Sequence, residues 1–416
     1  MDAEIQLRLI KVGEIYSPSF PIEIVQLFSG RMEQIKKVLS IIPEKGKHAV
    51  IYGDRGVGKT SFSNIIKILT EVNSQVVRVS CNSVDTVESL WENIFSQFTI
   101  PYEIATTTVS FKPTTNILQN EVPLLDIIGQ KKMTVKLILD MLPYLNRPVI
   151  IIDEFDRVDS NYFNKKLFTD LVKSISDRLP AVTLIIVGVS EDVSTLIQEH
   201  ESIERNLSQI YMPTMDSDEI KEIILKGEDP LGVKYDSSVV EDIIRLSSGF
   251  PHFTHSLCSN SASLAIIDRS NVVSNEHFKV AVNQTINNAH ESLKNGYRIA
   301  TMATKANIFK EVLFAASQVV PDEYGYFQAI DLSPILERIL SKPVPLQSYL
   351  THLGKFCVAE RGVVLKAVGG KNRKKYKFKN PLMKAFVRLN RTNDKYRAEL
   401  LKTASNTAEL RQSYTY

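Results

Sequence analysis

The stretch that decides the fold is Gly53-Asp54-Arg55-Gly56-Val57-Gly58-Lys59-Thr60, which fits the pattern G-x-x-x-x-G-K-[ST] at every fixed position. It follows His48-Ala49-Val50-Ile51-Tyr52, a short apolar run typical of a buried strand. A strand, a glycine-rich turn and a helix form a cradle whose backbone N–H groups and helix N-terminus bind phosphates. The stretch, with Ser61 after it, predicts a nucleoside triphosphate site in which Lys59 reaches the β- and γ-phosphates and the Thr60 hydroxyl ligates Mg²⁺.

The composition bounds the class of protein. With 416 residues, 44% hydrophobic and 23% charged, the chain exceeds what one core usually fills, so we expect two or three globular domains. The sequence has no run of about 18 apolar residues and no signal-peptide pattern at its start, so we expect a cytoplasmic protein without a membrane partner. Cys81, Cys258 and Cys357 are odd in number and far apart, which argues against a disulfide framework.

Charge is distributed unevenly along the chain. The net charge is +3, but residues 340–416 contain 17 Lys/Arg against 4 Asp/Glu, a balance of +13, which leaves −10 for residues 1–339. A basic C-terminal part on an acidic body indicates that this end contacts a polyanion.

Apolar runs that alternate with helical patterns define the central part of the chain. Val76–Ser80 reads as a strand, and residues 148–152 and 182–188 are unbroken apolar runs of the kind found in parallel strands buried on both faces. This alternation predicts an α/β fold with a doubly wound parallel sheet, in which ligands bind at the carboxyl ends of the strands. Residues 100–130 follow neither a helix nor a strand period, and we expect an insertion or mobile loop there.

Two acids end one of these apolar runs. Asp153 follows Ile152 directly and is suited to hold Mg²⁺, while Glu154 is suited to accept a proton from the attacking water. Two acids that cap a strand before a loop are also common in α/β proteins. Asp156 and Arg157 come next and are as compatible with solvated charges at a helix start as with functional groups.

Beyond residue 214 the pattern changes. Helical periods over residues 218–225, 239–246, 251–269 and 275–290 predict a helical lid. Three short helical stretches and two strands joined by a basic loop then follow the order of a winged helix. The expected division of the chain is an N-terminal extension (1–21), an α/β nucleotide-binding domain (22–214), a helical lid (215–300), a winged helix (301–390) and a polar tail (391–416) that is a short helix or disordered.

A family resemblance rests on Phe28-Ser29-Gly30-Arg31, the phosphate loop, Ile150-Ile151-Ile152-Asp153-Glu154 and a polar residue after the strand that ends at Gly188. Together these resemble the AAA+ ATPase module. The chain is most similar to its initiator-like branch, which includes origin-recognition-type ATPases, archaeal and STAND-type ATPases and transposon-associated AAA+ regulators. The resemblance implies ATP and Mg²⁺ as ligands.

The resemblance also implies roles for single residues. Gly30 and Arg31 would lie near the adenine, and Ser190 would hold the γ-phosphate or the attacking water. Arg205 would serve as an arginine finger for a neighbouring subunit of a homo- or hetero-oligomer, although it could instead pair with Glu201 or Glu204. His252 stands where relatives often have the sensor-2 arginine, and a neutral imidazole is a poor substitute, so slow hydrolysis is expected.

The basic C-terminal part points to DNA. The expected contacts are the cations of the loop and second strand: Lys371, Arg373, Lys374, Lys375 and Lys377. Few cations lie on the expected recognition helix, so phosphate contacts should dominate over base reading and binding should depend strongly on salt. A surface that contacts protein remains the alternative.

The sequence thus predicts an ATP-dependent switch that oligomerises and binds or remodels DNA, in replication initiation, transposition or genome defence. The alternative is a STAND-like signalling ATPase that recruits an effector protein without binding DNA.

Overall fold

The structure is a computed structural model that describes residues 2–18, 20–107, 115–190, 193–196, 201–302, 307–322, 324–370 and 373–413. The chain divides into two compact units. The α/β unit comprises Pro21–Asp54 and Gly58–Pro213, and the helical unit comprises Met1–Phe20, Arg55–Val57 and Thr214–Tyr416. The expected lid and winged helix therefore lie in one unit together with the N-terminal extension.

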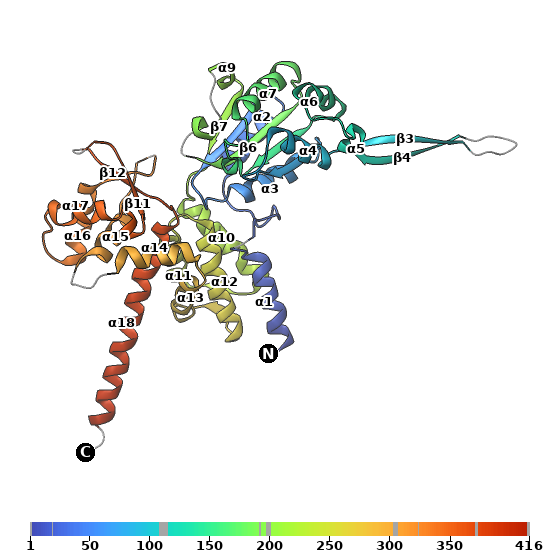
Figure 1. Cartoon of the computed structure of the whole chain (residues 1–416). Helices are drawn as coiled ribbons and strands as arrows, with labels where there is room; N and C mark the ends of the chain where they lie inside the picture. The colour runs from blue at the N-terminus through green and yellow to red at the C-terminus, as the bar shows by residue number, and fades with distance from the viewer. Residues whose placement is uncertain are drawn as a thin grey trace. The chain divides into compact units, whose positions relative to one another are not determined.

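The α/β unit is built on a five-stranded parallel sheet with the order β2-β5-β6-β1-β7, which confirms the predicted parallel α/β fold (Figure 1). Its strands are β1 (His48–Gly53), β2 (Val76–Ser80), β5 (Val149–Asp153), β6 (Thr183–Val189) and β7 (Leu207–Tyr211). Because all five are parallel, their carboxyl ends share one edge of the sheet.

Helices cover both faces of this sheet. Alternate residues of the strands, such as Ile150 and Ile152, join Trp91 in the hydrophobic core under α4 and α7, while Ile151 faces the side covered by α3. The helices of this unit are α2 (Met32–Ile41), α3 (Lys59–Thr70), α4 (Val87–Gln97), α5 (Leu124–Ile128), α6 (Val135–Met141), α7 (Lys165–Arg178), α8 (Val193–Leu196) and α9 (Glu201–Glu204), with 3₁₀ turns at Leu142–Tyr144 and Phe155–Arg157.

Residues 100–130 were expected to form an insertion or a mobile loop, and the mobile loop is wrong, because the described part of the segment contains two strands and a helix. An antiparallel hairpin of β3 (Thr99–Thr107) and β4 (Thr115–Pro123) extends from the α/β unit, and α5 follows it (Figure 1). The two strands form a sheet of their own. A two-stranded ribbon has no large buried face to impose an apolar alternation, so the β-branched content of the segment was the only signal.

In the helical unit, α1 (Ala3–Ile15) packs on α10 (Ser217–Leu231) and α12 (Pro251–Ile267), which belong to the region predicted as a lid. Asp216 and Glu219 form a capping box at the start of α10, and Gly232 ends it in the left-handed conformation. The helices and short strands of this region are α10 (Ser217–Leu231), β8 (Lys234–Tyr235), α11 (Ser237–Ser247), α12 (Pro251–Ile267), β9 (Val272–Val273) and α13 (Asn275–Asn287).

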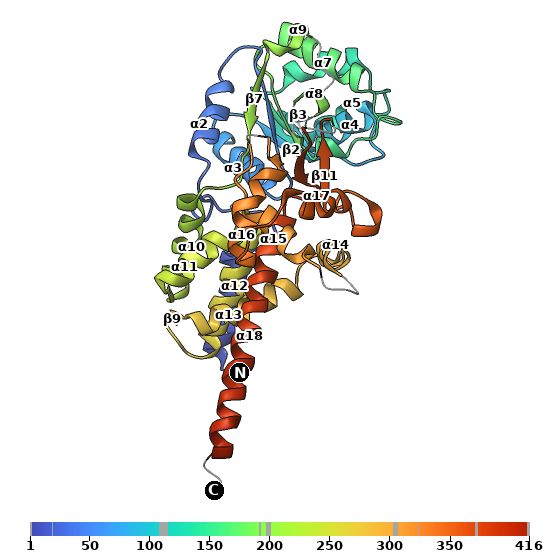
Figure 2. The same cartoon turned by 90° about the vertical axis from the view of Figure 1, so that its left-hand side faces the viewer.

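The C-terminal part combines α-helices with a three-stranded sheet of order β10-β12-β11. Its elements are α14 (Glu291–Thr301), α15 (Phe309–Gln318), β10 (Phe327–Gln328), α16 (Ser333–Leu340), α17 (Leu346–Lys355), β11 (Leu365–Val368) and β12 (Lys375–Phe378), with 3₁₀ turns at Ala329–Leu332 and Ala359–Arg361. The prediction for the tail is wrong, because α18 (Met383–Ser413) is one continuous helix that extends past the other helices of its unit (Figures 1 and 2). No helix in the described ranges has both the length and the apolar character needed to cross a membrane.

Candidate active site

The phosphate loop lies at the carboxyl end of β1 and leads directly into α3. Gly56 and Gly58 have φ angles of 87° and 93°, which residues with a Cβ rarely adopt, and Gly58 caps α3 in the left-handed conformation. Such a turn directs successive backbone N–H groups to one side, where they can bind an anion. A Cβ on Gly53 would lie 2.4 Å from the Met212 carbonyl oxygen, so the backbone at Met212 packs closely against the start of the loop.

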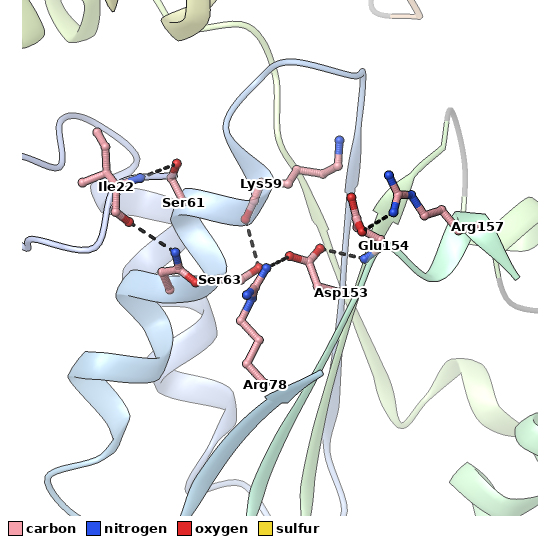
Figure 3. Close-up of polar contacts among 9 residues, drawn as sticks. Ile22, Lys59, Ser61, Ser63, Arg78, Asp153, Glu154 and Arg157 are labelled. Atoms are coloured by element: carbon pink, nitrogen blue, oxygen red, sulfur yellow. Dashed lines mark hydrogen bonds and ion pairs between the residues drawn. The ribbon is translucent and has the colours of Figure 1, made fainter. Parts of the chain in front are cut away.

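Lys59 and the residues after it face this loop. The Lys59 side chain is buried, and its ammonium donates to the carbonyl oxygens of Gly53 (3.0 Å) and Asp54 (2.8 Å), which holds a cation at the turn. Thr60 is half-buried in the first turn of α3. The Ser61 hydroxyl accepts a hydrogen bond from the backbone N–H of Ile22 at 3.1 Å (Figure 3). Ser61, which was predicted to contact the nucleotide, therefore holds the segment around Ile22 against α3.

The acid pair lies at the same edge of the sheet, at the end of β5 (Figure 3). Asp153 is only 2% exposed, and both of its carboxylate oxygens are engaged. Its Oδ1 accepts the backbone N–H of Glu154 at 2.8 Å, and its Oδ2 accepts from Nη2 of Arg78 at 2.5 Å. Arg78 was not predicted from the sequence, although a lone charge inside the apolar strand Val76–Ser80 was a signal for it.

Glu154 occupies a strained position. Its φ of 55° and ψ of 33° lie in the left-handed region, which is unfavourable for a residue with a side chain. This conformation turns the carboxylate out of the sheet, where its Oε2 lies 2.9 Å from Nη1 of Arg157. Arg157 therefore contacts one carboxylate oxygen of the predicted general base.

Ser190 follows β6, which lies between β5 and β1, so it lies at the edge that carries the phosphate loop and the acid pair. The pairing of Gly53 with Val189 puts Ser190 one residue beyond the start of the loop. Asp156 fixes this segment, because its Oδ1 accepts the backbone N–H of Val189 at 2.7 Å. The sheet thus brings Ser190 together with the triphosphate residues.

Arg205 lies at the opposite edge. It precedes β7, whose first residue pairs with His48 at the amino end of β1. A strand rises about 3.3 Å per residue, so the six residues of β1 separate Arg205 from its own phosphate loop by roughly 20 Å. Its guanidinium is exposed and contacts Asn206 at 3.4 Å, and no acidic partner for it is found among the described side chains.

The residues predicted near the adenine are part of the framework. Gly30 and Arg31 have φ angles of 67° and 63°, and Arg31 precedes α2. The buried Arg31 side chain donates to the Pro213 carbonyl oxygen at 2.6 Å. Arg31 therefore ties the segment before α2 to the end of the α/β unit.

His252 belongs to the helical unit, in the first turn of α12. Its Nδ1 lies 2.8 Å from the Pro18 carbonyl oxygen, so Nδ1 carries the hydrogen, and its ring stacks on that of His290 at 6.1 Å. Burial lowers the pKa of His252, with the nearby His290 acting in the same direction. The imidazole is thus neutral at pH 7 and lacks the positive charge of a sensor-2 arginine.

The structure separates the predicted DNA contacts into two groups. Lys375 forms an ion pair with Asp322 at 2.8 Å, and Lys377 is only 7% exposed, with its ammonium 5.7 Å from the centre of the Tyr326 ring. Arg373 and Lys374 are exposed, and Lys371 lies outside the described residues. On α17, Leu346 and Leu350 are 40% and 39% exposed.

Comparisons with known proteins agree with this geometry. Residues 44–196 match the AAA domain family, and no curated protein sequence matches the chain. A Walker-type ATPase of Pyrococcus abyssi is 13% identical over 90% of this chain and 99% of its own, with a TM-score of 0.51. ORC2 of Aeropyrum pernix is 12% identical (93% and 98% covered, TM-score 0.48), and ORC1 of the same organism, solved with DNA, is 14% identical (93% and 97%, 0.46). At 13% identity the likeness to the Walker-type ATPase concerns the fold alone.

Proposed function

We propose that this chain, whose residues 44–196 form an AAA domain, is an ATPase of the initiator-like type that assembles with neighbouring subunits according to its bound nucleotide. The observation that carries the proposal is the meeting of the phosphate loop, Asp153, Glu154 and Ser190 at one edge of the parallel sheet. We also propose a cytoplasmic location.

The residues at this edge fit ATP and Mg²⁺. The positive-φ glycines give the loop a backbone conformation that can direct N–H groups toward phosphate oxygens, and Lys59 supplies a positive charge beside them. The Thr60 hydroxyl and the buried Asp153 carboxylate are oxygen ligands of the kind that Mg²⁺ prefers. When bound, Mg²⁺ would neutralise charge on the β- and γ-phosphates.

The remaining residues orient the attacking water. Ser190 can donate a hydrogen bond to the γ-phosphate or to the water, and Glu154, which pairs with Arg157 through Oε2, can accept the water's proton. Because His252 is neutral, the helical unit does not supply a sensor-2 cation from this position. We therefore expect hydrolysis to be slow in the isolated subunit.

Arg205 is suited to act only on another subunit. Its position at the amino edge of the sheet, together with its exposure, favours a role in completing the ATP site of a neighbouring copy or related chain. ATP would then link adjacent subunits, and its hydrolysis would release them.

The experiment that tests this proposal mixes two inactive variants. Lys59→Ala lacks the phosphate-binding cation, and Arg205→Ala lacks the finger, so neither should hydrolyse ATP alone. A mixed oligomer contains some sites with an intact Lys59 on one subunit and an intact Arg205 on the next, so mixing should restore part of the activity. Lys47→Ala serves as a control: the Lys47 ammonium bonds the Arg205 backbone carbonyl, so this variant removes a nearby charge, keeps the Arg205 guanidinium and should remain active alone. No recovery on mixing, with every form monomeric in ATP, would refute the shared site.

For the C-terminal part we propose contact with the DNA backbone through Arg373 and Lys374. The element order α15-β10-α16-α17-β11-β12 is compatible with the predicted winged helix, and these two exposed cations lie between β11 and β12, where the wing is predicted. Arg373→Glu/Lys374→Glu should weaken binding to duplex DNA and reduce its salt dependence. Lys131→Glu/Lys132→Glu makes the same charge change at exposed positions of the α/β unit and is the matched control. Equal DNA affinity in both variants would contradict DNA contact by the wing.

A second candidate function is recruitment of an effector protein. It is favoured by the pairing of Lys375 with Asp322, by the burial of Lys377 and by the exposed leucines of α17. Leu346→Asp/Leu350→Asp should abolish an effector contact and leave DNA affinity and ATP hydrolysis unchanged. Loss of DNA binding in this variant, with the wing variant unaffected, would instead assign DNA contact to α17.

A further inference from the structure

Arg78 is a charged residue within an otherwise apolar strand. Its neighbours Val77 and Val79 are buried in the core beneath α4, and strand alternation directs Arg78 to the opposite face, on which α3 packs. On that face Arg78 pairs in register with Ile151, and Asp153 lies two residues further along β5. The Arg78 side chain therefore reaches along the sheet toward the carboxyl edge, where Figure 3 shows it against Asp153.

The ion pair between these residues uses the oxygen that a metal would need. Nη2 of Arg78 lies 2.5 Å from Oδ2 of Asp153, and Oδ1 already accepts the Glu154 N–H. The side chains are 21% and 3% exposed, so water screens the pair only weakly. A buried carboxylate without a counter-charge would be strongly destabilising, which gives the guanidinium a role whenever the metal is absent.

The guanidinium is not fully satisfied in this arrangement. Nε of Arg78 is buried and has no hydrogen-bond partner among the described residues. An arginine with a purely structural role usually has its donors paired. The unpaired Nε is consistent with a side chain whose contacts change when the site is filled.

We propose that Arg78 is a positioning residue that occupies the metal-binding oxygen of Asp153 in the empty site, so that Mg²⁺ must displace the guanidinium in order to bind. A dication and a guanidinium at one carboxylate oxygen repel each other, so the ion pair lowers the metal affinity. The same ion pair keeps Asp153 neutralised and oriented before nucleotide arrives. This inference rests on the proposed function, because it takes Asp153 as the Mg²⁺ ligand.

Removing the Arg78 charge should lower the stability of the metal-free protein but raise its metal affinity, whereas the loss of a purely structural residue would not raise the metal affinity. Arg78→Met keeps most of the side-chain volume and removes the charge. The metal-free variant should unfold at a lower denaturant concentration than the natural protein, whereas its metal affinity in the presence of nucleotide should rise by at least about tenfold. Arg78→Lys keeps a cation at this position and should restore most of the natural behaviour in both measurements. Lys67→Met removes one charge from the exposed face of α3, where Lys67 pairs with Glu71 at 3.6 Å, and should change neither quantity.

Mn²⁺ serves as the probe, because the electron paramagnetic resonance signal of the free ion falls when it binds. Each full-length protein is titrated with Mn²⁺ in the presence of slightly less than one equivalent of a non-hydrolysable ATP analogue, and a titration of the analogue without protein is the reference, because the free analogue also binds Mn²⁺. Tighter binding by Arg78→Met supports the proposal, and equal or weaker binding with an intact fold overturns it. If Arg78→Met does not fold, Arg78→Gln replaces it, with the same expectation. If the natural protein binds the ATP analogue but no Mn²⁺, both this inference and the assignment of Asp153 fail; if it binds both and Arg78→Met is not tighter, only this inference fails.

Discussion

His48 makes the stability of the α/β unit depend on pH in a way that one substitution can isolate. It begins β1 and is 0% exposed. Its Nδ1 accepts the Leu184 N–H at 3.1 Å, so Nε2 carries the hydrogen and donates it to the Ser176 hydroxyl at 2.8 Å. Protonation would turn Nδ1 from an acceptor into a donor that faces another donor, inside the core.

Burial lowers the pKa of His48 from 6.5 to about 4 in the folded protein. Between these values the unfolded chain binds a proton that the folded protein excludes, so stability is full above pH 6.5 and falls as the pH drops toward 4. At 1.36 kcal/mol per pKa unit, about 3 kcal/mol is at stake in total, of which about 2 kcal/mol is lost between pH 7 and pH 5.

The assay is urea unfolding followed by tryptophan fluorescence. Trp91 is the single tryptophan of the chain and lies in the core of the α/β unit, so its emission reports on that unit. His48→Asn keeps an acceptor near the Leu184 N–H and does not titrate. It should lower stability at pH 7, and it should lose about 2 kcal/mol less than the natural protein between pH 7 and pH 5. Equal pH dependence in the two proteins would refute the assignment to His48, and His48→Gln repeats the comparison.

Three further predictions follow from packing. Gly53→Ala should lower the stability of the α/β unit by at least about 2 kcal/mol in the same assay, because the new Cβ would meet the Met212 carbonyl oxygen; an unchanged stability would contradict this packing. Gly13→Ala within α1, where a Cβ meets no described atom within 4 Å, should instead stabilise the helical unit by about 0.5–1 kcal/mol. Of the three cysteines, Cys357 should react first with a thiol reagent in the native protein, because Cys81 and Cys258 are buried and burial raises the pKa of Cys81 to about 12. Rapid reaction of all three thiols would contradict the burial of Cys81 and Cys258. The Arg388 guanidinium donates hydrogen bonds to the carbonyl oxygens of Arg245 and Ser317 near the ends of α11 and α15. Arg388→Met should therefore lower the stability of the helical unit by about 1–3 kcal/mol and speed hydrogen exchange at these two helix ends, and unchanged exchange would rule out this role of Arg388. Lys395→Met, on the exposed side of α18, is the control and should have neither effect.

Local sequence was sufficient where a pattern has one physical cause. The phosphate loop needs glycines at positive φ and a lysine after them, so its residues identify it without any long-range information. The buried strands β5 and β6 were predicted because parallel strands covered on both faces are continuously apolar. The hairpin β3-β4 and the full length of α18 were missed because neither segment follows an apolar period over its whole length in the sequence.

The pairing of charges could not be predicted from the sequence. Arg157 is three residues from Glu154, and the two side chains pair where the backbone at Glu154 is left-handed. Nothing in the local sequence predicts this backbone conformation. Lys375 and Lys377 read as exposed cations of a wing, and only the packing of Asp322 and Tyr326 against them showed that they are engaged.

By itself the sequence determined that a triphosphate site lies between a strand and a helix, with two acids at the end of a later strand. Only the tertiary structure decided that Arg78 meets Asp153, that Arg205 lies at the far edge of the sheet from its own phosphate loop, and that His252 is a neutral partner of Pro18. The physical reason is that motifs depend on the conformation of a few adjacent residues, whereas the partner of a charge depends on strand order and register, which bring together residues that are distant in the chain.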